Sequence, residues 1–271
     1  MAFKDLLAIV LSAEQESVLA AAEALAARWK AHVAALHLVE LPQPVATPYG
    51  ADMWGEIMPE ARQQAAADRE KISARLKSFD PPAELRWAEA YPALLEDAVA
   101  YSALHADLTI VESASAGPGR LALEAALFNS GRPLLVTPPQ WRGDALGRRI
   151  LVAWSATREC ARAVADAAPF LEAAESVRIV TVDAKPASGS SSPPGVDIAA
   201  HLARRGTDVD LRHVDGLGRE AEDALLDEAR AIDADLIVMG GYGHSRLRQF
   251  VFGGVTRALT QMTPVPLFMA H

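Results

Sequence analysis

The chain has 271 residues and a mass of 28.9 kDa, which at roughly 100 to 200 residues per domain predicts about two domains. Apolar residues make up 51% and charged residues 23%, proportions that exclude a disordered chain, a collagen and a disulfide-stapled mini-protein. The 26 Lys and Arg against 35 Asp and Glu leave a net charge of -9, which argues against nucleic acid or an anionic membrane surface as a partner.

The first expected element is an apolar strand at residues 6–12. It follows Lys4 as a signal-peptide core would, but Asp5 interrupts the basic end, and residues 149–156 repeat the same pattern in mid-chain. A mid-chain copy cannot be an export signal, and no run approaches the roughly 20 apolar residues of a transmembrane helix. With Cys160 as the single cysteine, we expect a cytoplasmic protein without disulfides.

Amphipathic helices alternate with apolar strands through the first half. The remaining elements expected there are a helix at 14–30, a strand at 32–40, a strand at 84–89, a helix at 92–104, a strand at 105–111 and a final strand at 133–136. The second half repeats this order, with strands at 149–156, 176–183, 208–214, 233–239 and 266–269 and helices at 158–173 and 219–232.

Each half therefore has the order βαβαβαβαβ, which predicts an α/β fold of two tandem doubly wound domains. Each domain is expected to be a five-stranded parallel sheet with helices on both faces. We place the domains at residues 1–140 and 147–271, on either side of a Pro- and Gly-bearing stretch at 138–147. Residues 186–195 are rich in Ser, Pro and Gly, but they lie inside the second repeat and are expected to form a surface loop.

The loop after the fourth strand is where a doubly wound sheet binds ligands. In the second half its glycines have the spacing Gly240-x2-Gly243-x9-Gly253. Glycines allow close backbone approach and free amides favour an anion, so this loop suits a phosphate, with Arg246 adding positive charge and His244 a hydrogen-bond donor. On spacing alone, ordinary turn chemistry is the better explanation of the glycines. Neither GxxxxGK[ST] nor a complete GxGxxG occurs.

The GxxGx9G spacing, followed by Gly254-Val255-Thr256 and ending in Pro264-Val265-Pro266, resembles the nucleotide loop of the universal stress protein family. The duplication covers nearly the whole chain, so the chain resembles a tandem-domain member. The resemblance implies an adenine nucleotide α-hydrolase-like fold, binding of ATP or AMP, and association through the last strand of each domain. It also implies a stress-response role, with Mg²⁺ present only in company with ATP.

Carried over to this chain, the resemblance implies a nucleotide site formed by the loop and the neighbouring strand ends. Its residues are Trp154, Ser155, Val182, Met239, Gly240, Gly243, His244, Arg246, Gly253, Gly254, Val255 and Thr256. Two positions depart from the family pattern. Gly254 stands where a Ser or Thr hydroxyl usually reaches a phosphate, and Leu11 and Trp154 stand where an aspartate usually ends the first strand. Trp154 would either stack on an adenine or, as we favour, fill the cavity. Val182 is equally well explained as an adenine contact or as core.

The first half has lost the glycine motif, because Glu112 and Ser115 occupy the positions of Gly240 and Gly243. A carboxylate there repels phosphate, so residues 1 to about 140 are predicted to bind no nucleotide and to act as a structural partner. The two domains are expected to pair within the chain as a pseudo-dimer. Final strands left unpaired would instead join a second copy in a homodimer.

Other chemistry finds little support. The seven histidines include no HExxH, the acidic face around Glu222 and Asp227 is typical of a solvated helix, and Cys160 is expected to be an inert thiol. We expect no metal site of the protein's own and no catalytic residues. The leading hypothesis is a non-enzymatic stress-response regulator that binds an adenine nucleotide in its second domain. The alternatives are a scaffold that has lost nucleotide binding and a weak ATP-hydrolysing enzyme.

Overall fold

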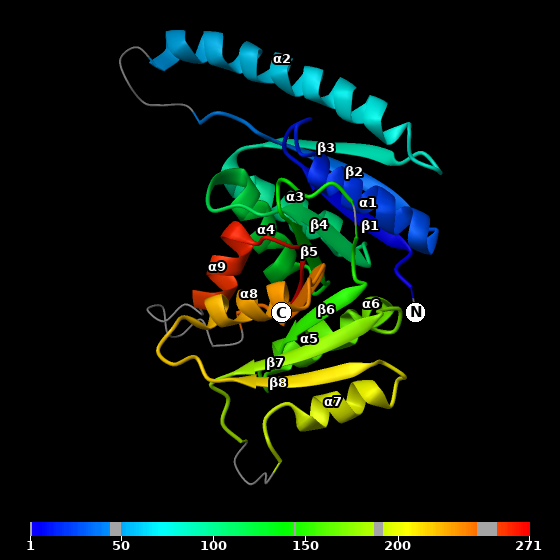
Figure 1. The fold of residues 1–271 in the computed structure, drawn as a ribbon. Helices are drawn as coiled ribbons and strands as arrows, with labels where there is room; N and C mark the ends of the chain where they lie inside the picture. Colours follow the sequence, from blue (N-terminus) through cyan, green and yellow to red (C-terminus); the bar gives the residue numbers. More distant parts are fainter. Residues whose placement is uncertain (1, 44–49, 144, 187–191, 243–253) are drawn as a thin grey trace.

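The structure is a computed structural model that describes residues 2–43, 50–143, 145–186, 192–242 and 254–271 (Figure 1). The first half runs β1 (Asp5–Val10), α1 (Glu16–Trp29), β2 (His32–Glu40), α2 (Gly50–Leu76), β3 (Glu84–Ala90), α3 (Pro92–Ala103), β4 (Leu108–Glu112), α4 (Gly117–Asn129) and β5 (Leu134–Thr137). The second half runs β6 (Arg149–Ala153), α5 (Arg158–Asp166), α6 (Ala168–Leu171), β7 (Ser176–Val182), α7 (Val196–Ala203), β8 (Val209–Val214), α8 (Ala221–Ala231), β9 (Leu236–Gly240), α9 (Gly254–Met262) and β10 (Leu267–Ala270).

The predicted fold class is confirmed, with helices alternating with parallel strands in both halves. One expected helix differs. Residues 158–173 form two helices, α5 and α6, because Pro169 lies in the first turn of α6 and cannot supply the backbone donor that would continue α5.

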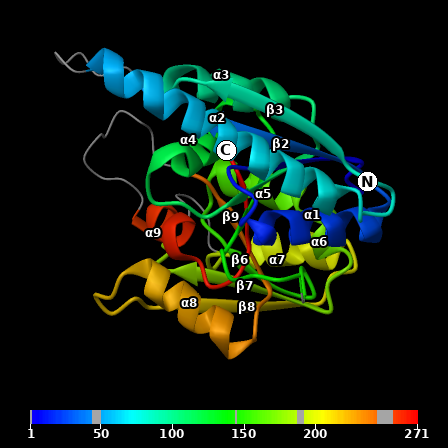
Figure 2. The ribbon, with the colours of Figure 1, turned by 90° about the horizontal axis from the view of Figure 1, so that it is seen from above.

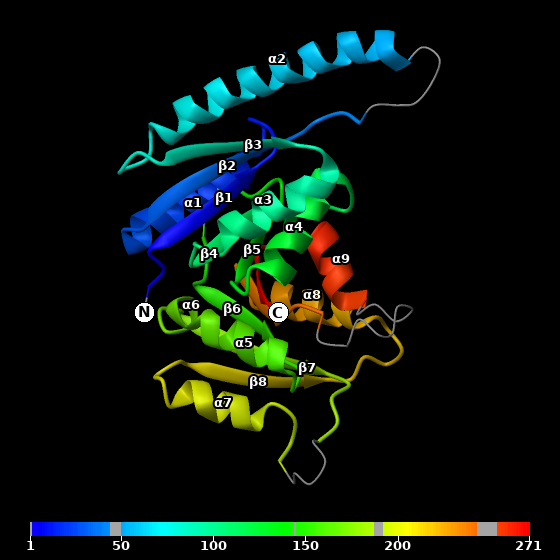
Figure 3. The ribbon, with the colours of Figure 1, turned by 180° about the vertical axis from the view of Figure 1, so that it is seen from behind.

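All ten strands lie in a single sheet, in the order β3-β2-β1-β4-β5-β10-β9-β6-β7-β8. Within each half every pairing is parallel, and β5 and β10 pair antiparallel in the middle, with Leu267 opposite Val136. Figures 1 and 3 show α2 at one end of this sheet, beside β3, and α7 at the other, beside β8. The two halves are therefore joined edge to edge through their last strands.

Helices cover both faces of the sheet, as the continuous apolar strands require (Figure 2). One buried cluster joins the strands to α1, α2, α5, α6 and α7, and the other joins them to α3, α4, α8 and α9. Each cluster contains residues from both halves. Phe3 contributes to this continuity, since its ring lies 6.0 Å from Phe170 and 6.3 Å from Phe268 of the second half.

The repeated Ala-Asp-Leu sequence has a structural explanation. The carboxylate of Asp107 accepts hydrogen bonds from the backbone amides of Lys4 (2.7 Å) and Asp5 (3.1 Å). In the second half, Asp235 accepts hydrogen bonds from the amides of Gly147 (2.8 Å) and Arg148 (2.9 Å). Each aspartate thus ties the start of the fourth strand of its half to the start of the first strand.

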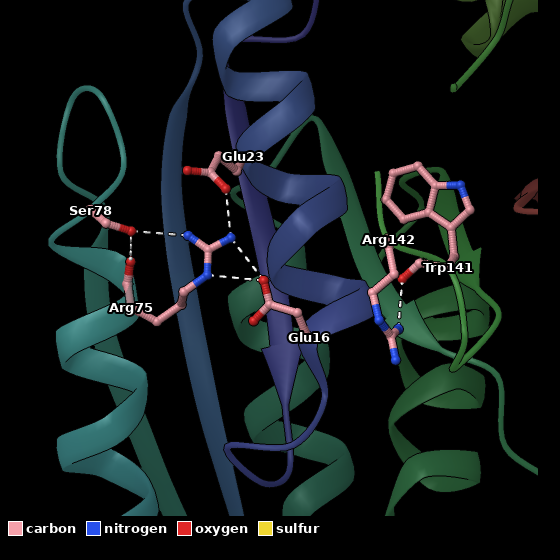
Figure 4. Close-up of polar contacts among 6 residues, drawn as sticks. All are labelled: Glu16, Glu23, Arg75, Ser78, Trp141 and Arg142. Carbon is pink, nitrogen blue, oxygen red and sulfur yellow. Dashed lines mark hydrogen bonds and ion pairs between the residues drawn. The ribbon is translucent and has the colours of Figure 1, made fainter. Parts of the chain in front are cut away.

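The long helix α2 is held against α1 by Arg75 near its carboxyl end (Figure 4). The guanidinium donates hydrogen bonds to Glu16 (2.8 Å) and Glu23 (2.6 Å) of α1 and to the hydroxyl of Ser78 (3.0 Å). The hydrogen bond to Glu23 is the largest of the effects that raise the pKa of Arg75. The same view shows Arg142 donating to the carbonyl oxygen of Trp141 in the segment that follows β5.

Candidate functional site

The order of the strands reverses between β6 and β9 in the second half. β6 continues into α5 on one face of the sheet and α9, which follows β9 in the chain, packs on the other. Doubly wound sheets bind ligands at the carboxyl ends of the strands where the order reverses in this way. The structure brings Trp154 and Ser155, which follow β6, to the same edge as Met239 and Gly240, which end β9. The sequence predicts a nucleotide at this carboxyl end of the strands.

Gly240 is required by packing. A Cβ atom added there would lie 2.6 Å from the backbone nitrogen of Cys160 and 2.8 Å from the carbonyl carbon of Glu159. The first glycine of the motif therefore allows β9 to approach the amino end of α5, whether or not a ligand binds. Gly243, His244, Arg246 and Gly253 lie outside the described residues.

The amino end of α5 already holds a carboxylate. Glu159 is 3% exposed and contacts Arg158, and Thr157 caps the helix by accepting a hydrogen bond from the amide of Cys160. Burial would raise the pKa of Glu159, but the hydrogen bond from Arg158 and those from its own amide and Thr157 lower the pKa below its usual value. An ionised side chain therefore occupies the position that a phosphate would take on this helix.

The described part of α9 begins at Gly254, which is exposed. Among the described residues, the nearest atom to a Cβ added at Gly254 would be Oε1 of Glu222, at 3.9 Å. Val255 packs on the neighbouring hydrophobic cluster and Thr256 is 6% exposed, so both of these side chains are engaged in packing. Oε2 of Glu222 is buried and has no hydrogen-bond partner among the described residues. The carboxylate of Glu222 therefore lies beside the start of the described part of α9, the candidate position for an anion.

The remaining predicted side chains divide between core and surface. Trp154 is half-buried and packs on the hydrophobic cluster of α5, which agrees with its favoured interpretation as a filling residue. Met239 is buried and Val182 half-buried in the other cluster. Ser155 is exposed, and its Oγ lies 3.2 Å from Sγ of Cys160. The strand register also shows that the first-half counterpart of Trp154 is Val10, and that Leu11 corresponds to Ser155.

The corresponding edge of the first half is closed by its own side chains. The carboxylate of Glu112 accepts hydrogen bonds from Ser17 (2.7 Å) and Gln15 (3.1 Å), and the side chain of Gln15 accepts one from the amide of Leu11 (2.6 Å). The glycine loop is also missing, because α4 begins at Gly117 directly after a short turn. These contacts support the prediction that the first half binds no nucleotide.

A cavity of about 590 Å³ lies between this turn and the link from α9 to β10. Its lining is mainly small and polar: Ser113, Ala114, Ser115, Ala116, Pro139, Gln140, Gln261, Thr263 and Pro264. Within the described part of the chain, no group of three or more His, Cys, Asp or Glu side chains is arranged to hold a metal ion. None of the helices described is long and apolar enough to cross a membrane.

Residues that sequence reasoning missed lie beside the site. The sequence places Glu222 only on an acidic helix face, and no sequence pattern points to Glu159 or Tyr242. Tyr242, two positions after Gly240, has a left-handed backbone (φ 52°). A Gly-Gly-Tyr-Gly sequence is a weak signal for such a conformation, because it does not say which residue adopts it.

The described elements define a doubly wound α/β protein with two halves of the same topology. Residues 147–271 match the family model of the universal stress protein family, so this half belongs to that family. Residues 5–137 repeat its topology.

Solved structures share the fold over the whole chain. A universal stress protein from Archaeoglobus fulgidus DSM 4304 is similar with a TM-score of 0.63 and 16% identity, over 100% of this chain and 96% of that chain. A putative universal stress protein from Pseudomonas aeruginosa UCBPP-PA14 gives 0.55 and 15%, over 98% and 92%. No curated protein sequence matches the chain significantly. A universal stress protein in complex with cAMP, with a TM-score of 0.32 and 20% identity over 52% of this chain and all of that chain, is too distant to indicate a ligand here.

Proposed function

We propose that the protein is a non-enzymatic, cytoplasmic stress-response regulator that binds an adenine nucleotide, ATP or AMP, at the carboxyl ends of β6 and β9 in the second half. The observation that carries the proposal is the reversal of strand order between β6 and β9, with the exposed Gly254 at the start of the described part of α9. Free amides at a helix start favour a phosphate. Membership of residues 147–271 in the universal stress protein family supports the same assignment.

The other helix start at this edge is less suited to an anion. α5 already has the carboxylate of Glu159 at its amino end. In the first half, Glu112 and its hydrogen bonds occupy the position equivalent to Gly240. One nucleotide per chain is therefore expected, with Mg²⁺ entering only together with ATP.

The first test is to denature freshly purified protein and identify released small molecules by absorbance and mass spectrometry, together with calorimetric titration of ATP and AMP. We expect close to one nucleotide per chain. A chain that releases none and binds neither nucleotide at millimolar concentration would disprove the proposal.

Gly254 allows a matched pair of variants at the phosphate position. Gly254→Ser adds the missing hydroxyl, and one hydrogen bond to a charged group corresponds to roughly 10- to 100-fold in affinity. Gly254→Asp adds a carboxylate beside Glu222 and should weaken binding at least about tenfold. Both side chains fit, because the nearest atom to the added Cβ is 3.9 Å away. Calorimetry measures the two affinities.

Gly55→Asp, at an open glycine on α2, is the control for an added surface charge. Equal affinities for the Gly254→Ser and Gly254→Asp proteins would place the phosphate away from α9. The second candidate function is a scaffold without nucleotide binding. The observation in its favour is the carboxylate of Glu222 beside Gly254, which has an oxygen without a partner among the described residues and would repel phosphate.

A further inference from the structure

Helix α4 of the first half contacts the residues that follow β9 in the second half. A Cβ on Gly241 would lie 3.0 Å from Cδ2 of Leu127, so this leucine packs directly on the backbone of Gly241. The ring of Tyr242 lies 5.1 Å from the ring of Phe128. Figures 1, 2 and 3 show α4 and α9 side by side. The glycine loop thus leaves its strand against the other half of the molecule.

Arg120 on α4 connects both sides of the loop. Its side chain is 15% exposed and makes an ion pair with Glu124 (2.7 Å). One terminal nitrogen donates a hydrogen bond to the hydroxyl of Tyr242, before the loop, and the other donates to Oγ1 of Thr260 (2.9 Å), in α9 after the loop. Thr260 is fully buried. A single guanidinium therefore links Tyr242, which follows β9, to Thr260 within α9.

The backbone at the loop entrance needs such contacts. Tyr242 has a left-handed conformation that L side chains rarely adopt, and it persists only where the surroundings hold it. The amide of Gly241 donates to the carbonyl of Ala270 (2.8 Å), and Nδ1 of His271 lies 2.9 Å from the carbonyl oxygen of Gly241. His271 in turn packs edge-on against Phe128 (5.0 Å). The first half contributes Phe128 and Arg120 to this arrangement.

We propose that Arg120 is a positioning residue through which the first half holds Tyr242, the last described residue after β9, in place relative to α9. The proposal rests on the proposed function for its effect on affinity, but its structural part does not require a ligand. Arginine is suited to this role because its planar fork presents several donors at once, whereas lysine offers a compact point charge. The first half, which has no glycine loop of its own, would then be needed for nucleotide binding by the second half.

The test compares Arg120→Ala, Arg120→Lys and Tyr242→Phe in the full-length protein. Hydrogen exchange of the Gly241 and Thr260 amides, measured without ligand, reports the stability of the two segments that Arg120 joins. We expect at least tenfold faster exchange at Gly241 in Arg120→Ala. Calorimetric titration with ATP should show at least tenfold weaker binding, which Arg120→Lys does not restore. Arg132→Ala is the matched control, because Arg132 is exposed and its side chain contacts only the carbonyl of Leu104 in the first half.

The double variant Arg120→Ala with Tyr242→Phe separates positioning from general electrostatics. If Arg120 acts through Tyr242, the combined loss of affinity should be smaller than the product of the two single losses. Full affinity in Arg120→Lys would show attraction of phosphate by charge and overturn the proposal, as would unchanged exchange at Gly241. Faster exchange with unchanged ATP affinity would also overturn it. A wild-type protein that binds no ATP, with exchange still faster in Arg120→Ala, would disprove the proposed function while supporting the positioning role.

Discussion

His37 shows how a single side chain depends on its tertiary surroundings. It lies on β2, is 1% exposed, and its Nδ1 has no hydrogen-bond partner among the described residues. Burial lowers the pKa of His37, and so does the charge of Arg69 on α2. Asp68, the carbonyl of Leu11 and Glu89 act in the opposite direction. The folded protein therefore holds this imidazole neutral at pH values where an unfolded chain would begin to protonate it.

The direction of the pH dependence follows from this lowered pKa. Well above pH 6.5, His37 is neutral in both the folded and the unfolded protein, so its protonation does not lower the free energy of unfolding. As the pH falls below that value, the unfolded chain takes up a proton that the folded chain does not, so the free energy of unfolding decreases. We expect a smaller fall in melting temperature between pH 7.5 and 5.5 for His37→Gln than for wild type. His201→Gln, on the exposed side of α7, is the control, and identical slopes for the two variants would contradict the prediction.

Gly240 and Gly254 show that residues of one type in one motif have different roles. Gly240 is required because β9 approaches the backbone of α5, whereas a Cβ on Gly254 would meet the described residues only at an ordinary contact distance, 3.9 Å from Oε1 of Glu222. In the sequence, the two positions are both glycines of the same loop region and cannot be told apart. Only the tertiary contacts show that a substitution at Gly240 perturbs the fold, whereas a substitution at Gly254 tests whether a ligand binds there.

At the scale of elements, α2 is the longest helix described, at 27 residues, and Arg75 holds its carboxyl end. The ion pairs with Glu16 and Glu23 are partly exposed, so we expect them to contribute about 1 kcal/mol at most to docking of the helix. Arg75→Ala should then raise the population of undocked α2 about fivefold. Limited proteolysis within residues 50–76 would measure this as faster cleavage.

Arg62→Ala is the matched control for this prediction, because Arg62 lies exposed on the same helix. The effect of Arg75→Ala should also shrink at high salt, since screening weakens the pairs in wild type. Equal cleavage rates for the two variants would mean that the hydrophobic contacts of Ile72 and Leu76 hold the helix without the ion pairs.

At the scale of the whole molecule, β5 and β10 use each other as pairing partners. The outer strands β3 and β8 carry charged residues along their length, which discourages the addition of another strand. We therefore expect a monomer of 28.9 kDa in solution by size-exclusion chromatography with light scattering. A mass twice as large at micromolar concentration would contradict this and would point to a surface other than the last strands.

The sequence by itself determined the repeat, the α/β class and the elements of each half. Apolar periodicity is a local property, and Asp107 and Asp235 mark the same strand entry in both halves. The resemblance to the universal stress protein family, whose model residues 147–271 match, was also visible in the spacing of the glycines. The pattern gave no bounds for α2, α4, α7 or α9, and it missed the break at Pro169 between α5 and α6.

Tertiary structure alone decided how the halves join and what surrounds the candidate site. The pairing of β5 with β10, the carboxylate of Glu222 beside Gly254, and the link from Arg120 to Tyr242 all join residues far apart in the chain. No periodicity records such contacts, because they arise when two separately patterned segments pack together. In this protein, the order of strands and helices in the repeat specifies at which end of the sheet a ligand is expected. The packing of one half on the other specifies which side chains surround that end.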